Sequence, residues 1–460
     1  MKKIIKYRYA AALVVMLLTL ASCNKYLDIN PRGTQVLTTT KDYDQWLNST
    51  EVETCEPSDL NDFGDNRDYL LGNFTLPPLP GAPRAYLWYD QFDPNISSTP
   101  LIWNQHYATI YYFNTVIQHV DKAIGDTQKK ASLKAEALIG RALEYLYLVN
   151  EYGKQYNPQT AATDLAVPFV ESNDLTTPVP QRSTVQQIYD HILADINAAI
   201  PNLPADNSTN RFRGDVAAAY SLLARTYLLM GNYTLAGTNA QAAITNATTN
   251  AMIDLNQGIT AVNFPFVLTR KDAIYARTYT GSNVINPQQS FLQSMDPNDI
   301  RLTMWYFNYT GKPVTAARLS YLRDNGNVIN NWGTSVQEMR LILAEVAARN
   351  NKLDEAAFQL DIVRRCRIKS ANYTIYTTND QAAMFQAVIK ERSFEMPFNG
   401  TRWFDMRRLN AEGKMPTVYR IDPTQLTTNA IATLAPNSPR YTLQIPIQIM
   451  YYHPDWKQNP

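Results

Sequence analysis

The sequence predicts an all-α protein: a tetratricopeptide-like helical scaffold that carries a loop-rich, irregular subdomain. Three observations support this prediction. Apolar residues recur every three or four positions over long stretches, which is typical of amphipathic helices. Two of these stretches, 120 residues apart, share one pattern of small and apolar residues. Long segments without such periodicity, rich in Asn, Thr, Tyr and Pro, separate and flank the helices.

The composition is that of a folded protein without a nucleic-acid partner. The 460 residues are 45% hydrophobic and 18% charged, which is enough apolar material for a large core. Lys and Arg number 42 against 41 acids, and no basic stripe interleaved with aromatics is present, so we expect no binding of nucleic acid. Three cysteines and four scattered histidines predict no disulfide framework, no metal site and no cofactor.

The first 22 residues predict a lipoprotein signal peptide. They carry four cations and no acid, followed by an apolar stretch over 10–20 that is too short to span a bilayer. The segment ends in Leu20-Ala21-Ser22-Cys23, which is similar to a bacterial lipobox, so we expect Cys23 to be acylated and to become the new N-terminus. An ordinary secretory peptide with an incidental cysteine is the alternative. Without residues 1–22 the chain has 38 basic and 41 acidic residues, a formal charge of −3.

The segment from residue 24 to about 100 shows little periodicity and predicts extended chain and loops. Its prolines crowd into 77–83, a run that no helix could contain. The first long helix is expected from Trp103 to about Val120 and the second over about 131–152, ending at Gly153. After an irregular stretch over 158–180, a cap and capping box at 183–186 predict a third helix that ends at Ile200, before Pro201.

Two hairpins of the tetratricopeptide kind follow, in which small residues let paired helices cross closely. The first consists of Leu223, Ala224, Tyr227, Gly231, Tyr233, Ala236, Ala240 and Ala243. The second consists of Leu343, Ala344, Ala347, Asn351, Leu353, Ala356, Leu360 and Val363. Asn351 replaces Gly231 at the turn between the helices, a position that Asn tolerates.

We therefore expect one domain over 23–460. Its helical repeats should cover about 103–250 and 334–410, and its irregular segments about 24–100, 250–333 and 411–460. A structureless loop as long as 250–333 would be unusual in a compact domain, so this region should fold onto the helices. Loops held by a rigid scaffold are where binding sites usually lie.

No hydrolase elbow, phosphate loop or metalloprotease motif occurs, which argues against the common enzyme classes. A dense polar cluster nevertheless follows one helix: Glu391, Arg392, Glu395, Asn399, Arg402, Trp403, Asp405 and Arg408. Glu391 and Glu395 share a helix face and should repel unless cations such as Arg402 or Arg408 fold back on them. We favour a structural ion network over a catalytic acid pair, because no nucleophile or histidine accompanies the acids.

The chain has 29 Tyr and 7 Trp, and aromatic rings exposed beside polar groups are suited to stack on sugars. The candidates lie in two irregular segments: Arg84, Trp88 and Tyr89, and then Tyr279, Trp305 and Tyr306. Core packing is the alternative for each ring, although it is the weaker explanation for Trp88 and Trp305, which lie in aperiodic segments.

Several motifs in this order resemble the SusD/RagB family of outer-membrane lipoproteins. They are Cys23 with Tyr26-Leu27-Asp28 and Pro31, Trp103 to Val116 with Asn114, Val167-Pro168-Phe169-Val170, Arg182-Ser183-Thr184-Val185 with Ile188-Tyr189 and Ile192, Glu391-Arg392 with Glu395, Phe398, Gly400, Arg402-Trp403-Phe404-Asp405 and Arg408, Ile445-Pro446-Ile447, and Gln458-Asn459-Pro460.

The resemblance implies a tetratricopeptide-like scaffold and a non-catalytic role at the cell surface. The protein would capture oligosaccharide and pass it to a SusC-like TonB-dependent transporter barrel, anchored in the outer membrane by acylated Cys23 and facing outside. The resemblance places ligand contacts in the two segments that hold Arg84, Trp88, Tyr89, Tyr279, Trp305 and Tyr306.

Three alternatives remain open from the sequence: a peptide-binding member of the same family, a lipid-anchored glycosidase with a carboxylate pair, and a lipoprotein scaffold whose repeats bind proteins. The sequence also leaves open whether Cys55 and Cys366 pair, although a buried thiol and a loop thiol are the simpler interpretation.

Overall fold

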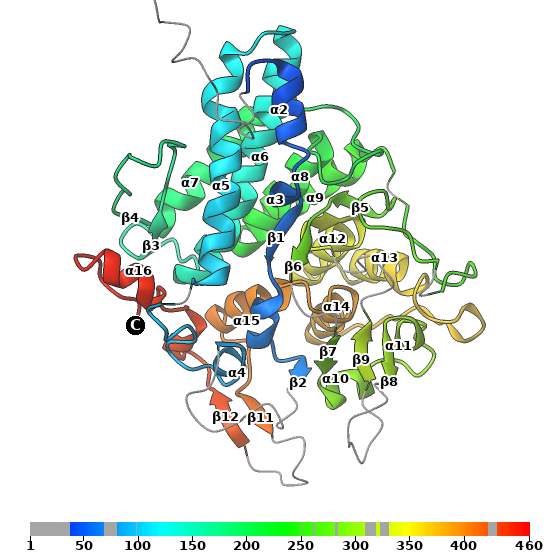
Figure 1. The fold of residues 1–460 in the computed structure, drawn as a ribbon. Coiled ribbons are helices and arrows are strands. Elements are labelled where there is room, and N and C mark those ends of the chain that lie inside the picture. Colours follow the sequence, from blue (N-terminus) through cyan, green and yellow to red (C-terminus); the bar gives the residue numbers. More distant parts are fainter. Residues whose placement is uncertain are drawn as a thin grey trace, which may run out of the picture.

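A computed structural model of the chain describes residues 37–68, 81–97, 99–249, 251–260, 263–280, 284–308, 319–322, 331–421 and 430–460. The described residues are mostly helical, with short strands, so the predicted fold class is confirmed. Figure 1 shows most of the long helices in the upper part of the molecule, with short strands both beside these helices and in the lower part. The signal peptide and Cys23 lie outside the described residues.

The first three long helices match the sequence expectation closely. They are α5 (Leu101–His119), α6 (Thr127–Tyr152) and α7 (Val185–Ala199). Helix α6 begins four residues earlier than expected, because the Asp126 side chain accepts a hydrogen bond from the Lys129 amide and caps it. The capping box of α7 is formed by Thr184 and Gln187. Helix α6 packs against both α5 and α7.

The two predicted hairpins are present as α8 (Val216–Leu229) with α9 (Tyr233–Asn246), and α12 (Val336–Arg349) with α13 (Leu353–Arg364). Gly231 and Asn351 both turn the chain in the left-handed region, with φ of 73° and 56°. Asn351 therefore adopts the same left-handed backbone conformation at its turn as Gly231 does, as the matched spacing predicts. Helix α12 also packs on α9, so the hairpins stack.

The polar cluster spans two further helices, α14 (Gln381–Glu395) and α15 (Thr401–Ala411). The chain reverses between them at Gly400, whose φ is 79°. A Cβ at that position would lie 2.4 Å from the ring of Trp332, so only glycine fits.

The described part of the N-terminal segment is not simply extended chain, and this prediction is wrong in part. It contains α2 (Thr40–Trp46), α3 (Thr50–Glu53), β1 (Thr54–Pro57), η1 (Ser58–Phe63), β2 (Arg67–Asp68) and α4 (Gly81–Tyr86). These elements are too short to reveal a helical period in the sequence. Helix α4 contains Pro83, which is tolerated because the backbone N–H groups of the first helical turn have no intrahelical hydrogen-bond acceptor, so the missing N–H of proline costs no hydrogen bond.

The central region folds onto the helices, as expected, through β5 (Ala273–Tyr275), β6 (Thr278–Thr280), β7 (Val284–Pro287), α10 (Gln289–Gln293), α11 (Arg301–Met304), β8 (Tyr306–Asn308), β9 (Leu319–Leu322) and β10 (Thr334–Ser335). A four-stranded sheet runs in the order β2, β7, β9, β8, and every pair in it is antiparallel. Strands β1 and β6 pair in parallel, with Thr54 opposite Thr278. The N-terminal segment is thus built into the central region.

The remaining elements are β3 (Leu165–Pro168), β4 (Arg182–Thr184), β11 (Val418–Ile421), β12 (Ala430–Leu434), α16 (Ile447–Tyr452) and the short 3-10 helices η3 (Val120–Lys122), η4 (Ile200–Asn202), η5 (Ser370–Asn372) and η6 (Pro439–Tyr441). The C-terminal tail is fixed by Asn459. Its side-chain amide donates to the Tyr152 carbonyl at 2.6 Å, and its side-chain oxygen accepts from Arg182 at 2.6 Å.

No helix among the described residues is both long and apolar enough to cross a membrane.

Candidate ligand-binding surface

The exposed ring of Tyr89 marks the candidate binding surface. Tyr89 follows α4 and is 42% exposed. The guanidinium carbon of Arg84 lies 4.7 Å from the centre of the Tyr89 ring, and Arg84 Nε donates to the Gln91 carbonyl at 2.7 Å. The arginine therefore holds the ring from one side while its own position is fixed by the following loop. We call the group formed by Arg84, Tyr89, Asp90 and Arg440 the Tyr89 surface.

Arg440 comes to this surface from the C-terminal part of the chain. Arg440 Nε donates to Asp90 Oδ1 at 2.8 Å, and both side chains are well exposed. The Gln91 side chain donates to the Ile445 carbonyl at 3.2 Å, which joins the loop after α4 to the tail. An aromatic face beside an acid and a base is the arrangement that binds a sugar ring and its hydroxyls.

Trp88, next to Tyr89, is a core residue. It is 1% exposed, and its indole Nε1 donates to the Phe63 carbonyl at 2.9 Å. The φ of Trp88 is 52°, in the left-handed region. With this backbone conformation the Trp88 side chain lies in the core, whereas the side chain of the next residue, Tyr89, is exposed. The interpretation that core packing is the weaker explanation for this ring is wrong, because its packing partners come from segments distant in the sequence.

Arg420 of β11 contacts the buried Trp88 ring and stabilises its position. The sequence did not predict this role. The Arg420 guanidinium carbon lies 4.1 Å from the Trp88 ring centre and 4.2 Å from that of Tyr86. Its nitrogens donate to the carbonyls of Tyr86, Asp62 and Gly64 at 2.9, 2.8 and 2.7 Å. Burial lowers the pKa of Arg420, as expected for a cation bonded to carbonyls rather than to an acid. No sequence signal marks this residue.

Trp305 and Tyr306 are also buried, at 4% and 2% exposure. They belong to a second, smaller core with Ile253, Leu255, Phe264, Phe291, Leu292, Met295, Met304, Phe394 and Phe398. The interpretation that core packing is the weaker explanation for Trp305 is therefore wrong as well. Both rings stabilise the central region and offer no face to a ligand in this structure.

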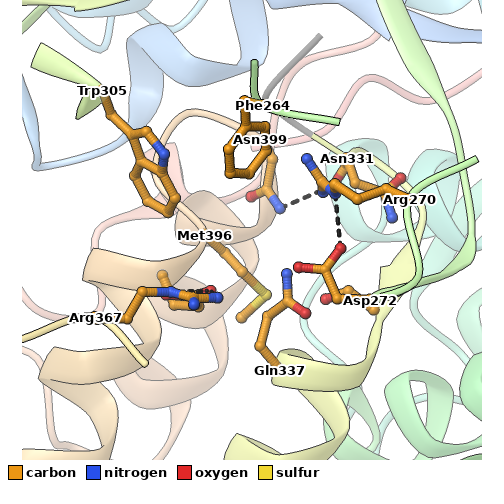
Figure 2. Close-up of a pocket in the computed structure, with 11 residues that line it drawn as sticks. Phe264, Arg270, Asp272, Trp305, Asn331, Gln337, Arg367, Met396 and Asn399 are labelled. Carbon is orange, nitrogen blue, oxygen red and sulfur yellow. Dashed lines mark hydrogen bonds and ion pairs between the residues drawn. The ribbon is translucent and has the colours of Figure 1, made fainter. Parts of the chain in front are cut away.

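Figure 2 shows Trp305 at the wall of a small polar cavity with Phe264, Arg270, Asp272 and Gln337. The cavity measures about 30 Å³, far below the roughly 300 Å³ of an ordinary ligand site. It has the size for one or two water molecules. It is therefore not a sugar site.

Tyr279 lies in β6, next to β1, and its side chain is outside the part of the structure that is described. Of the six predicted binding residues, the structure brings Arg84 and Tyr89 together at an exposed surface. It places Trp88, Trp305 and Tyr306 in the cores.

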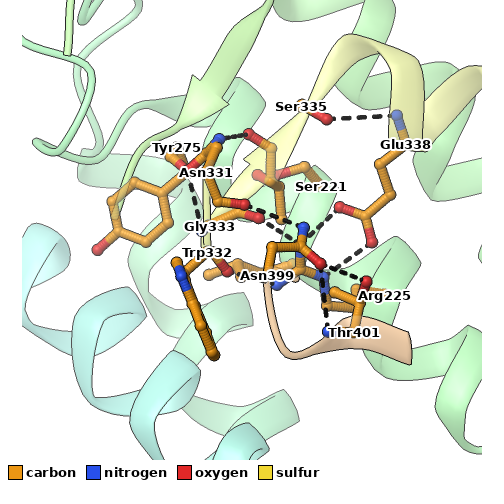
Figure 3. Close-up of polar contacts among 12 residues, drawn as sticks. Ser221, Arg225, Tyr275, Asn331, Trp332, Gly333, Ser335, Glu338, Asn399 and Thr401 are labelled. Atoms are coloured by element: carbon orange, nitrogen blue, oxygen red, sulfur yellow. Dashed lines mark hydrogen bonds and ion pairs between the residues drawn. The ribbon is translucent and has the colours of Figure 1, made fainter. Parts of the chain in front are cut away.

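A buried hydrogen-bond network fixes the segment before α12 to the scaffold (Figure 3). Arg225 on α8 donates to both carboxylate oxygens of Glu338, at 2.9 and 2.6 Å, and Ser221 and Thr334 share a hydroxyl contact of 2.6 Å. The Asn399 side chain reaches the Asn331 carbonyl at 3.2 Å. The network joins the first hairpin, the second hairpin and the turn before α15.

Glu391 and Glu395 are paired with cations other than the predicted Arg402 and Arg408. Arg301 of α11 donates to Glu391 at 2.7 Å and to Glu395 at 2.8 Å, and it also binds Asp299 at 2.6 Å. The expected partners were wrong because Arg301 lies 90 residues away in the sequence, and no local pattern could bring it to α14.

Arg402 instead forms two hydrogen bonds of 2.6 Å to Asp65, while Arg408 binds Asp405 and Glu345. Burial alone would raise the pKa of Asp405, but Arg392 and Arg408 lower it to about 2. Each carboxylate in this cluster faces a guanidinium, which supports the structural interpretation over a catalytic acid pair.

Cys366 is the cysteine whose side chain the structure describes. Cys366 is a free, half-buried thiol, so it does not bridge to Cys55, whose side chain is outside the described set. Burial raises the pKa of the Cys366 thiol and so disfavours the reactive thiolate. Among the residues with described placement, no group of three His, Cys, Asp or Glu side chains could hold a metal ion.

Two family models match the chain. A family model described as "Starch-binding associating with outer membrane" matches residues 81–228, and a model of the SusD family matches residues 336–460. The chain is 23% identical to SusD-like protein P2 of Formosa agariphila over 87% of its own length and 90% of that protein. It is 26% identical to the starch-binding protein SusD of Bacteroides thetaiotaomicron over 62% of its length and 54% of that protein.

Solved structures share the fold. A SusD superfamily protein from Bacteroides thetaiotaomicron superposes with a TM-score of 0.72 at 21% identity, covering 92% of this chain and all of the other. A putative sugar-binding protein from Bacteroides vulgatus superposes with a TM-score of 0.69 at 22% identity, covering 93% of this chain and 99% of the other.

Proposed function

The chain belongs to the SusD/RagB family, and on this premise we propose that it is a lipid-anchored, non-catalytic protein of the cell surface that captures oligosaccharide for a TonB-dependent outer-membrane transporter. Relatives that are starch-binding or putative sugar-binding proteins support a glycan as the ligand. The ion-paired carboxylates around α14 support a binding role over hydrolysis, because they leave no free acid for proton transfer in that cluster.

The observation that carries the proposal is the Tyr89 surface. A flat ring, 42% exposed and backed by a guanidinium, covers the apolar C–H face of a sugar, and Asp90 and Arg440 can bond its hydroxyls. Trp88, the residue before Tyr89, is buried and hydrogen-bonded to the Phe63 carbonyl, which fixes the backbone that carries the Tyr89 ring. A preorganised ring loses little side-chain entropy on binding, which favours affinity.

The anchor and the partner complete the proposal. Residues 1–22 would be removed and Cys23 acylated, so that a single domain over 23–460 is held at the outer membrane. The family model's own description, association with the outer membrane, supports this location. A SusC-like barrel would receive the glycan, with the binding protein lying over it.

The binding test compares Tyr89→Ala with Phe358→Ala in the soluble 24–460 chain. Phe358 of α13 is also an exposed aromatic residue, 58% accessible, and has no part in the Tyr89 surface. A glycan array identifies a ligand, and titration calorimetry then measures both variants. We expect Tyr89→Ala to weaken binding at least about fivefold, the loss of roughly 1 kcal/mol of ring stacking, with Phe358→Ala unchanged. Binding of peptides alone, or product release from polysaccharide, would contradict the proposal.

The anchor test uses Cys23→Ser in the full chain. We expect the variant to lose incorporation of labelled fatty acid and to leave the membrane fraction. A wild-type protein that co-purifies with a barrel receptor supports delivery to a transporter, whereas recovery with periplasmic assembly factors alone supports the scaffold alternative instead.

A further inference from the structure

A second open groove runs beside α14, on a part of the molecule separate from the Tyr89 surface. It measures about 520 Å³, within the range of ordinary ligand sites, and lies between α14, the end of α13 and the loop before α11. Figure 1 places α13 and α14 to the right of α15, whereas α4, which carries the Tyr89 surface, lies below α15. Two small residues, Ala383 and Ala387, leave room along the α14 side of the groove.

Two of the three acids that line this groove are hydrogen-bonded to one buried arginine. Arg301, which is fully buried, donates to Asp299 and to Glu391 at 2.6 and 2.7 Å. Arg301 therefore offsets part of their negative charge from the protein side of the groove. The third acid, Asp296, is half-buried, and one of its oxygens accepts from the backbone and side-chain nitrogens of Asn298.

Two cations that line the groove are less fully paired than Arg301. Lys390 is exposed, lies 5.6 Å above the Phe394 ring centre, and makes no ion pair with any residue that the structure describes. The Nε atom of Arg364 is buried without a hydrogen-bond acceptor among the described residues. Arg364 forms an ion pair with Glu391, whose Oε2 lies 3.6 Å from Nε, beyond hydrogen-bond range. The Arg364 side chain is 20% exposed, so an incoming anion can contact its accessible part together with Lys390.

An aromatic ring stands at the same end of the groove. Tyr376 lines it and is half-buried, with the guanidinium carbon of Arg364 5.9 Å from its ring centre. The Gln386 side chain, exposed on α14, adds a neutral hydrogen-bonding group. Ring, amide and two cations together suit a polar, ring-shaped ligand with a negative substituent better than they suit a neutral one.

We propose that this groove is a second glycan subsite and that it binds a sugar carrying an anionic group, a carboxylate or a sulfate, through Arg364 and Lys390. The inference rests on the proposed function and gives the substrate class: oligosaccharides with acidic sugars. Arg364 supplies the fork that fits two oxygens of the anion, and Lys390 supplies a mobile second charge. Binding should weaken as salt is raised, because Lys390 is exposed to solvent.

The test uses the full-length protein in detergent and three probes: tri-galacturonate, its fully methyl-esterified form, and a sulfated galactose tetrasaccharide. The ester keeps the carbohydrate skeleton and removes the charge. Calorimetry compares the wild type with Arg364→Gln/Lys390→Gln. The control is Arg365→Gln/Lys352→Gln, which removes a neighbouring arginine and a lysine that pair with Asp361 and Glu355 outside the groove. Thermal denaturation checks that both variants remain folded.

We expect the wild type to prefer a charged probe to the ester and the groove variant to bind that probe about tenfold more weakly or worse, the size expected for a lost charge-assisted contact. The control should bind as the wild type does. A preference for tri-galacturonate identifies carboxylate as the anion, and a preference for the tetrasaccharide identifies sulfate.

Three results would overturn the inference. Equal affinity of the wild type for the charged and the esterified probes would overturn it, and so would equal losses of affinity in the groove variant and the control. In both cases binding of a neutral glycan would still support the proposed function. Binding of no glycan by the wild type would overturn both.

Discussion

Replacing Trp88 by Ala tests whether this ring is a core residue or a ligand contact. The structure predicts that the substitution lowers stability strongly and affects glycan binding only through the loop that carries Tyr89. The neighbouring change, Tyr89→Ala, should have the opposite profile. Two adjacent aromatic residues thus have separable roles, set by the positive φ of Trp88 that turns one ring inward and leaves the other outside.

The size of the effect follows from the contacts of Trp88. Truncating a fully buried tryptophan to Ala costs roughly 3–5 kcal/mol, through lost burial and the cavity left behind. The hydrogen bond from Nε1 to the Phe63 carbonyl adds about 1 kcal/mol, and Arg420 loses the ring that it contacts at 4.1 Å. We therefore expect a loss of about 4–6 kcal/mol, against about 1 kcal/mol or less for exposed Tyr89.

Urea denaturation followed by circular dichroism measures the loss without depending on the removed fluorophore. The midpoint should fall clearly for Trp88→Ala and stay near the wild-type value for Tyr89→Ala. Glycan affinity is measured on the folded fraction at low temperature. A Trp88→Ala protein with an unchanged midpoint and abolished binding would refute the reasoning, because the ring would then have to face the ligand.

Three further predictions concern stability, each measured by the urea midpoint. Arg301→Met should cost about 3–5 kcal/mol at pH 8 by removing the cation that is hydrogen-bonded to Glu391, and less at pH 5, because burial then raises the pKa of Glu391 further and the acid takes up a proton; equal losses at both pH values would count against this. Burial raises the pKa of Asp215 to about 7, above its ordinary range, so its stabilisation is present at low pH and is lost as the pH rises from about 4 to 7. Asp215→Asn keeps the helix cap and should gain up to about 4 kcal/mol over the wild type at pH 8 but nothing at pH 4; a loss at pH 8 would contradict it. Asn351→Gly should be neutral within about 0.5 kcal/mol, whereas Asn351→Ala should cost about 1 kcal/mol, because φ is 56° there; the reverse order would be inconsistent with the turn.

The helical scaffold was predictable because its signals are local. Periodicity, caps and the matched turn residues Gly231 and Asn351 can each be recognised within one or two turns of chain. Short elements such as α4 carry too few residues for a period, so the sequence of the N-terminal segment predicts extended chain and loops where the structure has short helices and strands. Residue spacing alone cannot distinguish a six-residue helix from a loop.

The candidate site was predictable only in its location. Arg84 and Tyr89 do meet at an exposed surface, but Trp88 and Trp305 lie in cores assembled from distant segments, and nothing near them in sequence signals that burial. Arg301 is the same case for charge: its partner Glu391 is 90 residues away, so the cluster could be recognised from the sequence but its cations could not.

The most direct test of glycan capture at the Tyr89 surface is a crystal structure of the protein with an oligosaccharide that it binds. The account predicts density for a sugar ring stacked on the outer face of Tyr89, with hydroxyls near Asp90 and Arg440, while Trp88 stays in the core. A saturating ligand found elsewhere, with the Tyr89 ring uncovered, would contradict the account.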